Sequence, residues 1–498
     1  MILRRINWLE EHNSNLSIRK EGMNSFLWLT SAQVFRISAL LVSTILLSRM
    51  IPKEDFGIFA MSATLINFIN IFRDAGMSNS IIQAKIVKES QVSTIFWLNI
   101  AISLSLSSGV LILSFPIAHF YNQPNLIPLI SVLAIGIFAS GAAVQHDALL
   151  RRAMMYRTVS VLDIISTGAA GICAILIAQN GGGWWALVAQ KVIQILIYTA
   201  FVWMACDWRP RFLWSWQDSR VIANFGAQIS IFNFVNYFSR NGDNILIGSY
   251  WGPALLGVYA KSYETLLGPL IQIANPLANT LLPILSRLTT DPERYRATLL
   301  FPYKAAILCT LPAGMMMLCL PEATVYLIFG SGWEEAVPVL QWLGIAVATQ
   351  IAGSASGTAF ISQKRGRDYI ITGLFCSVIS ILSFCLGLPF GIGSVAMVYS
   401  LMYVLVQQPF IFWMVGREGP VTSRDMFSLL GLPFICSLFS VPSLLAVRAY
   451  VTEPESLTTF FVGCLTSVFV QTLVLLAIPS GRNIMRVACH SFMYRKAR

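Results

Sequence analysis

"ILIGSYWGPALLGVYAKS" (Ile245–Ser262) decides the fold prediction, because it repeats an earlier stretch of the chain. "ILLSRMIPKEDFGIFAMS" (Ile45–Ser62), 200 residues before it, carries the same Ile, Leu, Gly, Ala and Ser at five matching positions. Further on, "GWWALVAQ" (Gly183–Gln190) resembles "GSVAMVYS" (Gly393–Ser400) at an offset of 210. A sequence that resembles itself at such a distance predicts two halves of similar structure.

The composition is that of a membrane protein. Of the 498 residues, 56% are hydrophobic and 11% charged, whereas soluble domains average about 45–50% apolar and about 25% charged residues. Apolar runs of about 20 residues recur, and each is long enough to cross roughly 30 Å of hydrocarbon. We predict an all-α polytopic membrane protein with 14 transmembrane helices. The expected spans are about 24–48, 56–72, 92–118, 125–149, 158–178, 184–206, 221–248, 254–283, 299–328, 336–362, 368–387, 391–415, 426–449 and 457–479.

The positive charges alternate between the connecting segments. Of the 34 Lys and Arg residues, 26 fall on one side of the predicted membrane, and three (Arg49, Lys53 and Arg448) fall on the other. By the positive-inside rule, both termini are expected in the cytoplasm. The same distribution explains the net charge of +11 without nucleic acid as a partner.

The sequence offers little for catalysis or metal binding. The predicted outer loops are too short to fold as a catalytic domain, so we expect no enzyme activity and no catalytic residues. The nine cysteines contain no C-x-x-C pair, and most lie within predicted spans. We therefore expect no metal site, no disulfide framework and no cofactor.

The repeat predicts how the spans are grouped. Six spans, an even number, separate equivalent positions, so the two copies share one orientation and form parallel lobes. Helices 13 and 14 are then an appendix. We expect a cytoplasmic tail at 1–23, an N-terminal six-helix lobe at 24–220, a C-terminal six-helix lobe at 221–415, helices 13 and 14 within 416–479, and a basic cytoplasmic tail at 480–498.

Three cations lie deep inside predicted spans, on spans 1, 7 and 8. A charge at the bilayer centre costs roughly 2.5–3.5 kcal/mol on insertion scales. Polar residues accompany these cations at steps of three and four, which places them on one helix face. Such a face cannot point at lipid, so we expect a wet, cationic cleft between the lobes. Its expected substrate-binding residues are Arg36, Arg240, Lys261, Asn233, Asn236 and Asn275.

An alternative reading is that these charges form structural ion pairs. Arg240 with Asp243, and Lys261 with Glu264, have the i,i+3 spacing of neighbours on a helix. The cleft explains better why polar stripes gather on the spans that begin both lobes, but the ion pairs stay open as an alternative. The carboxylates expected to couple transport to an ion, or to form such pairs, are Asp243, Glu264, Asp163 and Asp74.

Span 8 contains helix-disrupting residues. Gly268, Pro269 and Pro276 interrupt its apolar run. Such residues either break a transmembrane helix and expose carbonyl groups or produce an ordinary kink. The sequence leaves both readings open.

Several stretches resemble the polysaccharide transporter (Wzx-type flippase) family of the multidrug/oligosaccharidyl-lipid/polysaccharide exporter superfamily. The resemblance covers about residues 24–415. The stretches that carry it are "DAGMSNSIIQ" (Asp74–Gln83), "STIFWLNI" (Ser93–Ile100), "GGGWWALVAQ" (Gly181–Gln190), "YFSRNGDNILIGSYWGPALLGVYAKSY" (Tyr237–Tyr263) and "LLPILSRLTTDPERYR" (Leu281–Arg296).

The resemblance implies a function. Such proteins move undecaprenyl-pyrophosphate-linked oligosaccharides from the cytoplasmic to the periplasmic leaflet of the bacterial inner membrane, for the synthesis of extracellular polysaccharide. They use alternating access between two six-helix lobes around a cationic cavity. Arg36 and Arg240 stand where the family places cavity cations. Lys261 is a weaker match, because its repeat equivalent is Met61.

The resemblance also implies the partners: a lipid-linked oligosaccharide as substrate, the lipid bilayer, and the polysaccharide polymerase and export machinery. The chain itself is expected to be a monomer. Alternatives remain among related activities. The chain could instead export another substrate, such as a peptidoglycan lipid precursor or a small-molecule drug, or it could be a polytopic glycan polymerase. A drug exporter would favour acidic cavity residues, whereas the excess charge within these spans is basic.

Overall fold

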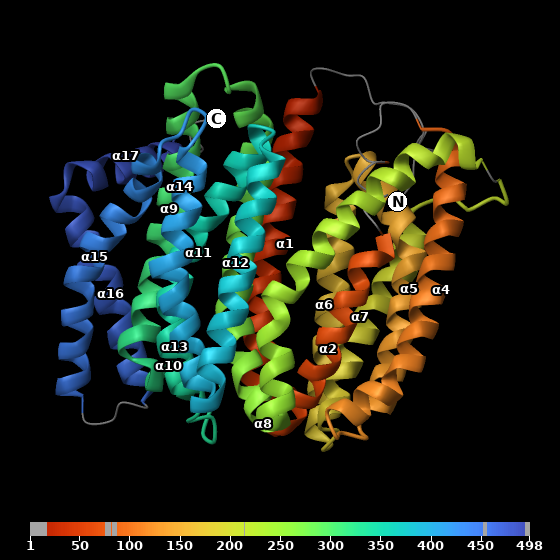
Figure 1. The fold of residues 1–498 in the computed structure, drawn as a ribbon, viewed down its shortest axis with the longest axis horizontal. Helices are drawn as coiled ribbons and strands as arrows, with labels where there is room; N and C mark the ends of the chain where they lie inside the picture. Colours follow the sequence, from red (N-terminus) through yellow and green to blue (C-terminus); the bar gives the residue numbers. More distant parts are fainter. Residues whose placement is uncertain (1–16, 75–80, 82–86, 214, 452–455, 494–498) are drawn as a thin grey trace. The chain divides into compact units, whose positions relative to one another are not determined.

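The structure is a computed structural model, and it describes residues 17–74, 81, 87–213, 215–451 and 456–493. The described chain is built from helices (Figure 1). It divides into two compact units, Met1–Gly257 and Val258–Arg498. The all-α architecture predicted from the composition is therefore confirmed.

Within the first unit, three to five residues join α1 to α2, α4 to α5, α5 to α6 and α6 to α7, as expected for antiparallel neighbours. Within it, α5 packs against both α4 and α7, and α1 packs against α6. The helices are α1 (Ser17–Ser48), α2 (Lys53–Asp74), α4 (Glu89–Phe120), α5 (Leu126–Arg152), α6 (Tyr156–Gln179), α7 (Trp184–Ala205) and the first part of α8 (Trp216–Arg287).

The second unit begins within α8 and ends with a helix that follows the last predicted span. Within it, α9 packs against α11, α15 and α16. The remaining elements are α9 (Pro292–Cys319), α10 (Pro321–Ile328), α11 (Ala336–Ser362), α12 (Gly366–Gly387), the 3-10 helix η1 (Leu388–Phe390), α13 (Ile392–Met402), the π-helix η2 (Tyr403–Gln407), α14 (Gln408–Gly416), α15 (Ser423–Tyr450), α16 (Leu457–Ala477) and α17 (Pro479–Met493).

The membrane-spanning character of the chain is visible in its helices. Among the described residues, nine helices are long and apolar enough to cross a membrane. The bent pair Ala336–Ala346 and Thr349–Ser362 makes ten if it is one span. Every range predicted as a span lies largely within a helix. The chain is thus a polytopic membrane protein, and the number fourteen stays a prediction.

The long helix α8 changes direction at Gly252. This residue has φ 79° and ψ −175°, a conformation outside the helical region that glycine adopts without strain. Pro253 follows, and proline is well suited to the first turn of a new helix. After Pro253 the helix continues to Arg287. Gly268, Pro269 and Pro276 therefore lie within a continuous helix, which favours the reading of an ordinary kink over a break.

The backbone repeats at the offset of 210 residues found in the sequence. Helix α5 ends in a turn in which Met154 has φ 56°, and α11 ends in a turn in which Lys364 has φ 59°. In each turn the next residue donates its backbone N–H to the carbonyl five residues earlier, at 3.0 Å from Met155 and 2.9 Å from Arg365. Two more left-handed pairs share the offset: Asn122 with Gly332, and Gly181 with Gly391. The two halves of the chain thus share turn geometry as well as sequence.

Two glycines related by the repeat allow the start of α2 to cross the second part of α8. A Cβ atom at Gly57 would lie 1.7 Å from the carbonyl oxygen of Pro253, and one at Gly257 would lie 2.0 Å from that of Lys53. Lys53 and Pro253 are also 200 residues apart, so the contact is reciprocal. All four residues belong to the first unit. The separation leaves no room for a side chain at either glycine.

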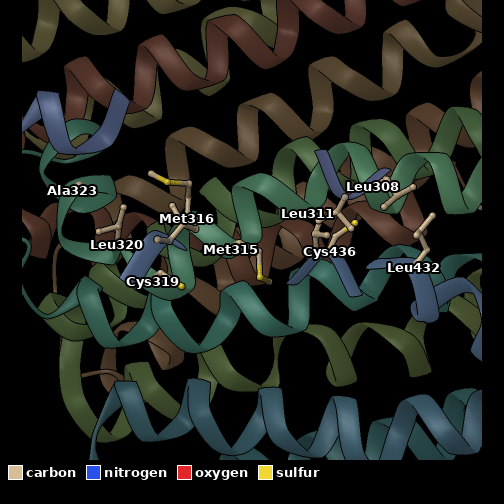
Figure 2. Close-up of a cluster of buried hydrophobic side chains, with 11 residues drawn as sticks. Leu308, Leu311, Met315, Met316, Cys319, Leu320, Ala323, Leu432 and Cys436 are labelled. Carbon is tan, nitrogen blue, oxygen red and sulfur yellow. The ribbon is translucent and has the colours of Figure 1, made fainter. Parts of the chain in front are cut away.

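The hydrophobic core of the second unit gathers around α9 and α10, with residues from α15 and α16 (Figure 2). A polar contact joins α16 to the same region. Pro312 has no N–H, so the carbonyl of Leu308, four residues earlier, has no donor within the helix. The Gln471 side chain of α16 donates to this carbonyl at 2.6 Å. The core comprises Leu308, Leu311, Met315, Met316, Cys319, Leu320, Ala323, Leu432, Cys436, Leu444 and Val474.

The glycine crossing gives a stability prediction. We expect Gly57→Ala and Gly257→Ala each to destabilise the protein by about 1–3 kcal/mol, because the added methyl group overlaps backbone atoms. The matched control is Gly109→Ala in α4, where a Cβ would meet no described atom within 4 Å. The control should be neutral or stabilising by roughly 0.5–1 kcal/mol. Thermal unfolding of the purified variants measures this, and equal melting temperatures for Gly57→Ala and Gly109→Ala would contradict the close crossing.

Candidate functional site

One ion pair in the first unit joins α1 to α6. The guanidinium of Arg36 donates a hydrogen bond to the Asp163 carboxylate and forms an ion pair with it. The Arg36 side chain is 45% exposed, and that of Asp163 is 19% exposed. The pair thus lies at the edge of the helix contact, and much of the arginine remains accessible.

Small residues bring α1 and α6 close together around this pair. A Cβ at Gly168 would lie 3.7 Å from the ring of Phe35, and one at Gly171 would lie 3.5 Å from the hydroxyl oxygen of Ser43. That hydroxyl also accepts a hydrogen bond from the Gln190 side chain of α7, at 3.3 Å. Small residues and polar cross-links of this kind stabilise helix contacts in membranes. The backbone of α1 that carries Arg36 is therefore held in place by contacts with α6 and α7.

The guanidinium of Arg36 is chemically suited to bind an anion. An arginine carries five N–H donors in a planar fork. This fork matches the geometry of a carboxylate or a phosphate. Asp163 occupies part of the fork, and the exposed part of the Arg36 side chain can meet a second anion. The contact that the structure shows for this fork is the one with Asp163, and its binding of a second anion stays a prediction.

The polar stripe predicted on the first part of α8 is described only in part. Tyr237 is buried, its hydroxyl donates to the carbonyl of Thr64 in α2, and its ring lies 5.3 Å from that of Phe68. Asp243 is also buried, and its carboxylate accepts the backbone N–H of Asn244 at 2.8 Å. These two members of the stripe thus lie in the interior of the first unit. The side chains of Arg240, Asn233, Asn236 and Asp74 lie outside the described residues.

The predicted residues of the second unit lie on the second part of α8. The Lys261 ammonium and a Glu264 carboxylate oxygen are 3.0 Å apart, which is the i,i+3 pair considered from the sequence. The Lys261 side chain is 12% exposed and that of Glu264 is 55% exposed. Asn275, further along the helix, is exposed. Lys261 is therefore the less accessible of the two described cations, and its membership of a substrate cavity stays a prediction.

Sequence reasoning did not single out a set of buried polar residues in the first unit. Asn99 of α4 and Gln145 of α5 are fully buried, and within the described part of the chain neither side-chain amide has a hydrogen-bond partner. The neighbouring His146 is also buried and stacks on Trp203, with ring centroids 4.2 Å apart. The available signal was polar residues within apolar spans, as with Asn99 in "STIFWLNI". Among the described residues, no group of three or more His, Cys, Asp or Glu could hold a metal ion.

The fold is shared with solved proteins. It is similar to the lipid II flippase MurJ in its inward closed conformation, with a TM-score of 0.72 and 12% identity over 90% of this chain and 98% of that one. It is also similar to an inward-facing multidrug resistance MATE family transporter of the MOP superfamily, with a TM-score of 0.62 and 13% identity over 81% and 98% of the two chains. The chain has the fold of the MOP superfamily.

The family follows from the sequence comparison. Residues 46–338 match the family model described as polysaccharide biosynthesis protein, and the chain belongs to this family. The lipopolysaccharide biosynthesis protein WzxC of Escherichia coli K12 is 23% identical over 70% of this chain and 72% of its own length. The teichuronic acid biosynthesis protein TuaB of Bacillus subtilis is 26% identical over 70% and 73%. The succinoglycan biosynthesis transport protein ExoT of Rhizobium meliloti is 24% identical over 61% and 62%. The chain is a membrane transport protein of polysaccharide biosynthesis, not an enzyme.

The exposure of Arg36 leads to a prediction about water. In a background without native cysteines, Arg36→Cys should react with a membrane-impermeant, hydrophilic thiol reagent, because a charged side chain within a span needs a wet surrounding. Two matched controls should stay unreactive: Thr44→Cys, buried on the same helix, and Ile112→Cys, 71% exposed on the apolar helix α4. The reaction rates are measured in membrane vesicles of both orientations, so that the reagent reaches each face of the membrane. Protection of Arg36→Cys to the level of Ile112→Cys would contradict it.

Proposed function

We propose that the protein is a flippase that moves undecaprenyl-pyrophosphate-linked oligosaccharide repeat units from the cytoplasmic to the periplasmic leaflet of the bacterial inner membrane. The product would serve the synthesis of extracellular polysaccharide. The observation that carries the proposal is the half-exposed Arg36 on α1, in a chain that belongs to the polysaccharide biosynthesis family. Its guanidinium would donate hydrogen bonds to a pyrophosphate oxygen of the substrate.

The energetics of Arg36 support a role beyond pairing. An arginine at the bilayer centre costs roughly 2.5–3.5 kcal/mol. Asp163 covers only part of the guanidinium, because 45% of the Arg36 side chain stays exposed. The contact with Asp163 therefore offsets only part of that cost. A water-filled surrounding supplies the rest, and a polar, anionic substrate requires such a surrounding.

The names of the relatives support the substrate class. WzxC, ExoT and TuaB are assigned to lipopolysaccharide, succinoglycan and teichuronic acid, so the polymers differ. Proteins that serve different polymers need a shared feature to recognise, and a polyprenyl pyrophosphate carrier is one. The MurJ structure, named as a lipid II flippase, shows that this fold occurs in a protein that flips a lipid-linked precursor.

The proposed architecture has 14 transmembrane helices, both termini in the cytoplasm, and two six-helix lobes that alternate access to a central cavity. Arg36 would share that cavity with Arg240, Lys261, Asn233, Asn236 and Asn275. The carboxylates Asp163, Asp243, Glu264 and Asp74 would pair with these cations or couple transport to an ion. The partners would be the lipid-linked substrate, the bilayer and the polymerase and export machinery, and the flippase itself would act as a monomer.

One further candidate is a flippase for the peptidoglycan lipid precursor. The TM-score of 0.72 with MurJ favours it, but that similarity rests on 12% identity and shows the fold. The match to the polysaccharide biosynthesis family favours the first proposal. The two candidates differ in the lipid that accumulates when the protein is absent.

Deletion of the gene should therefore cause an undecaprenyl-pyrophosphate-linked polysaccharide repeat unit to accumulate and the surface polymer to be lost. Mass spectrometry of extracted lipids identifies the intermediate. The parent chain should restore the polymer, and so should the control variant Val34→Ala, which shortens an exposed apolar side chain on α1. Accumulation of the peptidoglycan precursor would instead support the second candidate. An unchanged lipid profile together with normal polymer would contradict both.

A further inference from the structure

In the segment predicted as a basic tail from residue 480, the structure describes a helix, α17 (Pro479–Met493). Helix α16 ends at Ala477, and α17 begins at Pro479. Within the second unit, α17 runs across the end of the helix bundle and does not continue along α16 (Figure 1). Its opening residue is a proline, which suits the first turn of a helix and cannot extend the one before it.

One face of α17 is anchored on the protein. Gly481 is buried, and a Cβ there would lie 2.4 Å from the carbonyl oxygen of Leu475 in α16. One turn further, Ile484 packs against the hydrophobic core of the second unit drawn in Figure 2. The position of the helix is therefore set by close contacts rather than by sequence propensity alone.

The opposite face of α17 is basic. Arg482 and Arg486 are one helical turn apart, and both are exposed, as is Asn483 between them. Neither arginine forms an ion pair with a carboxylate of the described chain. Residues 479–498 contain no Asp or Glu, and their five basic residues are Arg482, Arg486, Arg495, Lys496 and Arg498. Arg482 and Arg486 thus have no paired carboxylate within the described part of the chain.

The expected position of α17 at the membrane surface suggests which group neutralises the charge of its arginines. α16 is one of the helices long and apolar enough to cross a membrane. Since α17 starts two residues after α16 ends, it starts at the level of the lipid headgroups. A basic amphipathic helix next to a transmembrane helix is a typical binding surface for anionic lipid. The arginine fork also suits a phosphodiester better than a point charge would.

We propose that the Arg482–Arg486 face of α17 binds the phosphate headgroups of anionic phospholipids in the leaflet at which α16 ends. This inference depends on α16 crossing the membrane. It does not depend on the transported substrate, so it can fail while the proposed function stands. The ligand is a bulk phospholipid such as phosphatidylglycerol or cardiolipin.

The test uses the full-length protein in a neutral detergent, titrated with cardiolipin while thermal unfolding is followed. Cardiolipin should raise the melting temperature, and neutral phosphatidylcholine should not. Each basic residue near an anionic surface contributes roughly a fivefold gain in affinity, so Arg482→Gln/Arg486→Gln should need about 25 times more cardiolipin for the same half-maximal shift. Arg482→Lys/Arg486→Lys, which keeps the charge, should retain most of the effect.

The matched control is Asn483→Gln, which changes an exposed but uncharged side chain between the two arginines and should leave the titration unchanged. An identical titration for the parent and the double Gln variant would overturn the proposal. So would an equal melting-temperature shift with inorganic phosphate alone, because the bound group would then be a free anion. A shift produced by undecaprenyl pyrophosphate but not by cardiolipin would also overturn it, because the surface would then recognise the substrate.

Discussion

The need to satisfy polar groups inside hydrocarbon is the constraint on which the structure depends. An unsatisfied polar backbone group in lipid costs several kcal/mol, which is why the predicted spans are built from helices. Where a helix cannot satisfy its own carbonyls, a side chain does so. Gln471 reaches the Leu308 carbonyl freed by Pro312. Arg365 donates at 2.8 Å to the carbonyls of Met414 and Val415 near the end of α14. In the same way, the Asp163 carboxylate partly neutralises the charge of Arg36.

The internal repeat adds a second constraint. Reciprocal contacts at Gly57 and Gly257 join segments that are equivalent in the repeat, so a larger side chain in either copy would push the same two helices apart. The turns at Met154 and Lys364 keep a left-handed residue in both copies even though neither is glycine. The chain thus keeps the backbone of its repeat where side-chain identity has been lost. The ion pair of Arg36 with Asp163 joins α1 to α6, so the cation lies on two helices of the first copy of the repeat.

Much of the fold could be predicted because single helices are encoded locally. Apolar runs predicted where helices lie, and the i,i+3 spacing predicted the pair of Lys261 with Glu264. The break of α9 at Leu320 was missed, although Pro321 follows it. So was the π-helix Tyr403–Gln407, just before Pro409. A proline signals a disturbed helix, but whether a break, a kink or a π-turn results depends on neighbouring helices.

The candidate site was less predictable than the fold. Arg36 and Asp163 are 127 residues apart, and spacing along one helix cannot reveal a contact between two helices. The α17 helix was missed because the charges of a short basic segment dominate its composition, while its anchoring contacts come from α16 and the core. The ion pair and the position of α17 depend on contacts between segments that are distant in the sequence, and the sequence alone therefore did not predict them.

The most direct experiment asks whether Arg36 binds the substrate or only neutralises Asp163. Polymer export and membrane protein level are measured together for Arg36→Ala, Arg36→Lys, Asp163→Ala and the double alanine variant. If Arg36 binds pyrophosphate, Arg36→Ala abolishes export at a normal protein level, and Arg36→Lys, which keeps the charge but loses the fork, leaves export partial. The double variant then stays inactive. If Arg36 only neutralises Asp163, removing both charges leaves no unpaired carboxylate, and export recovers. Substantial recovery in the double variant would contradict the account.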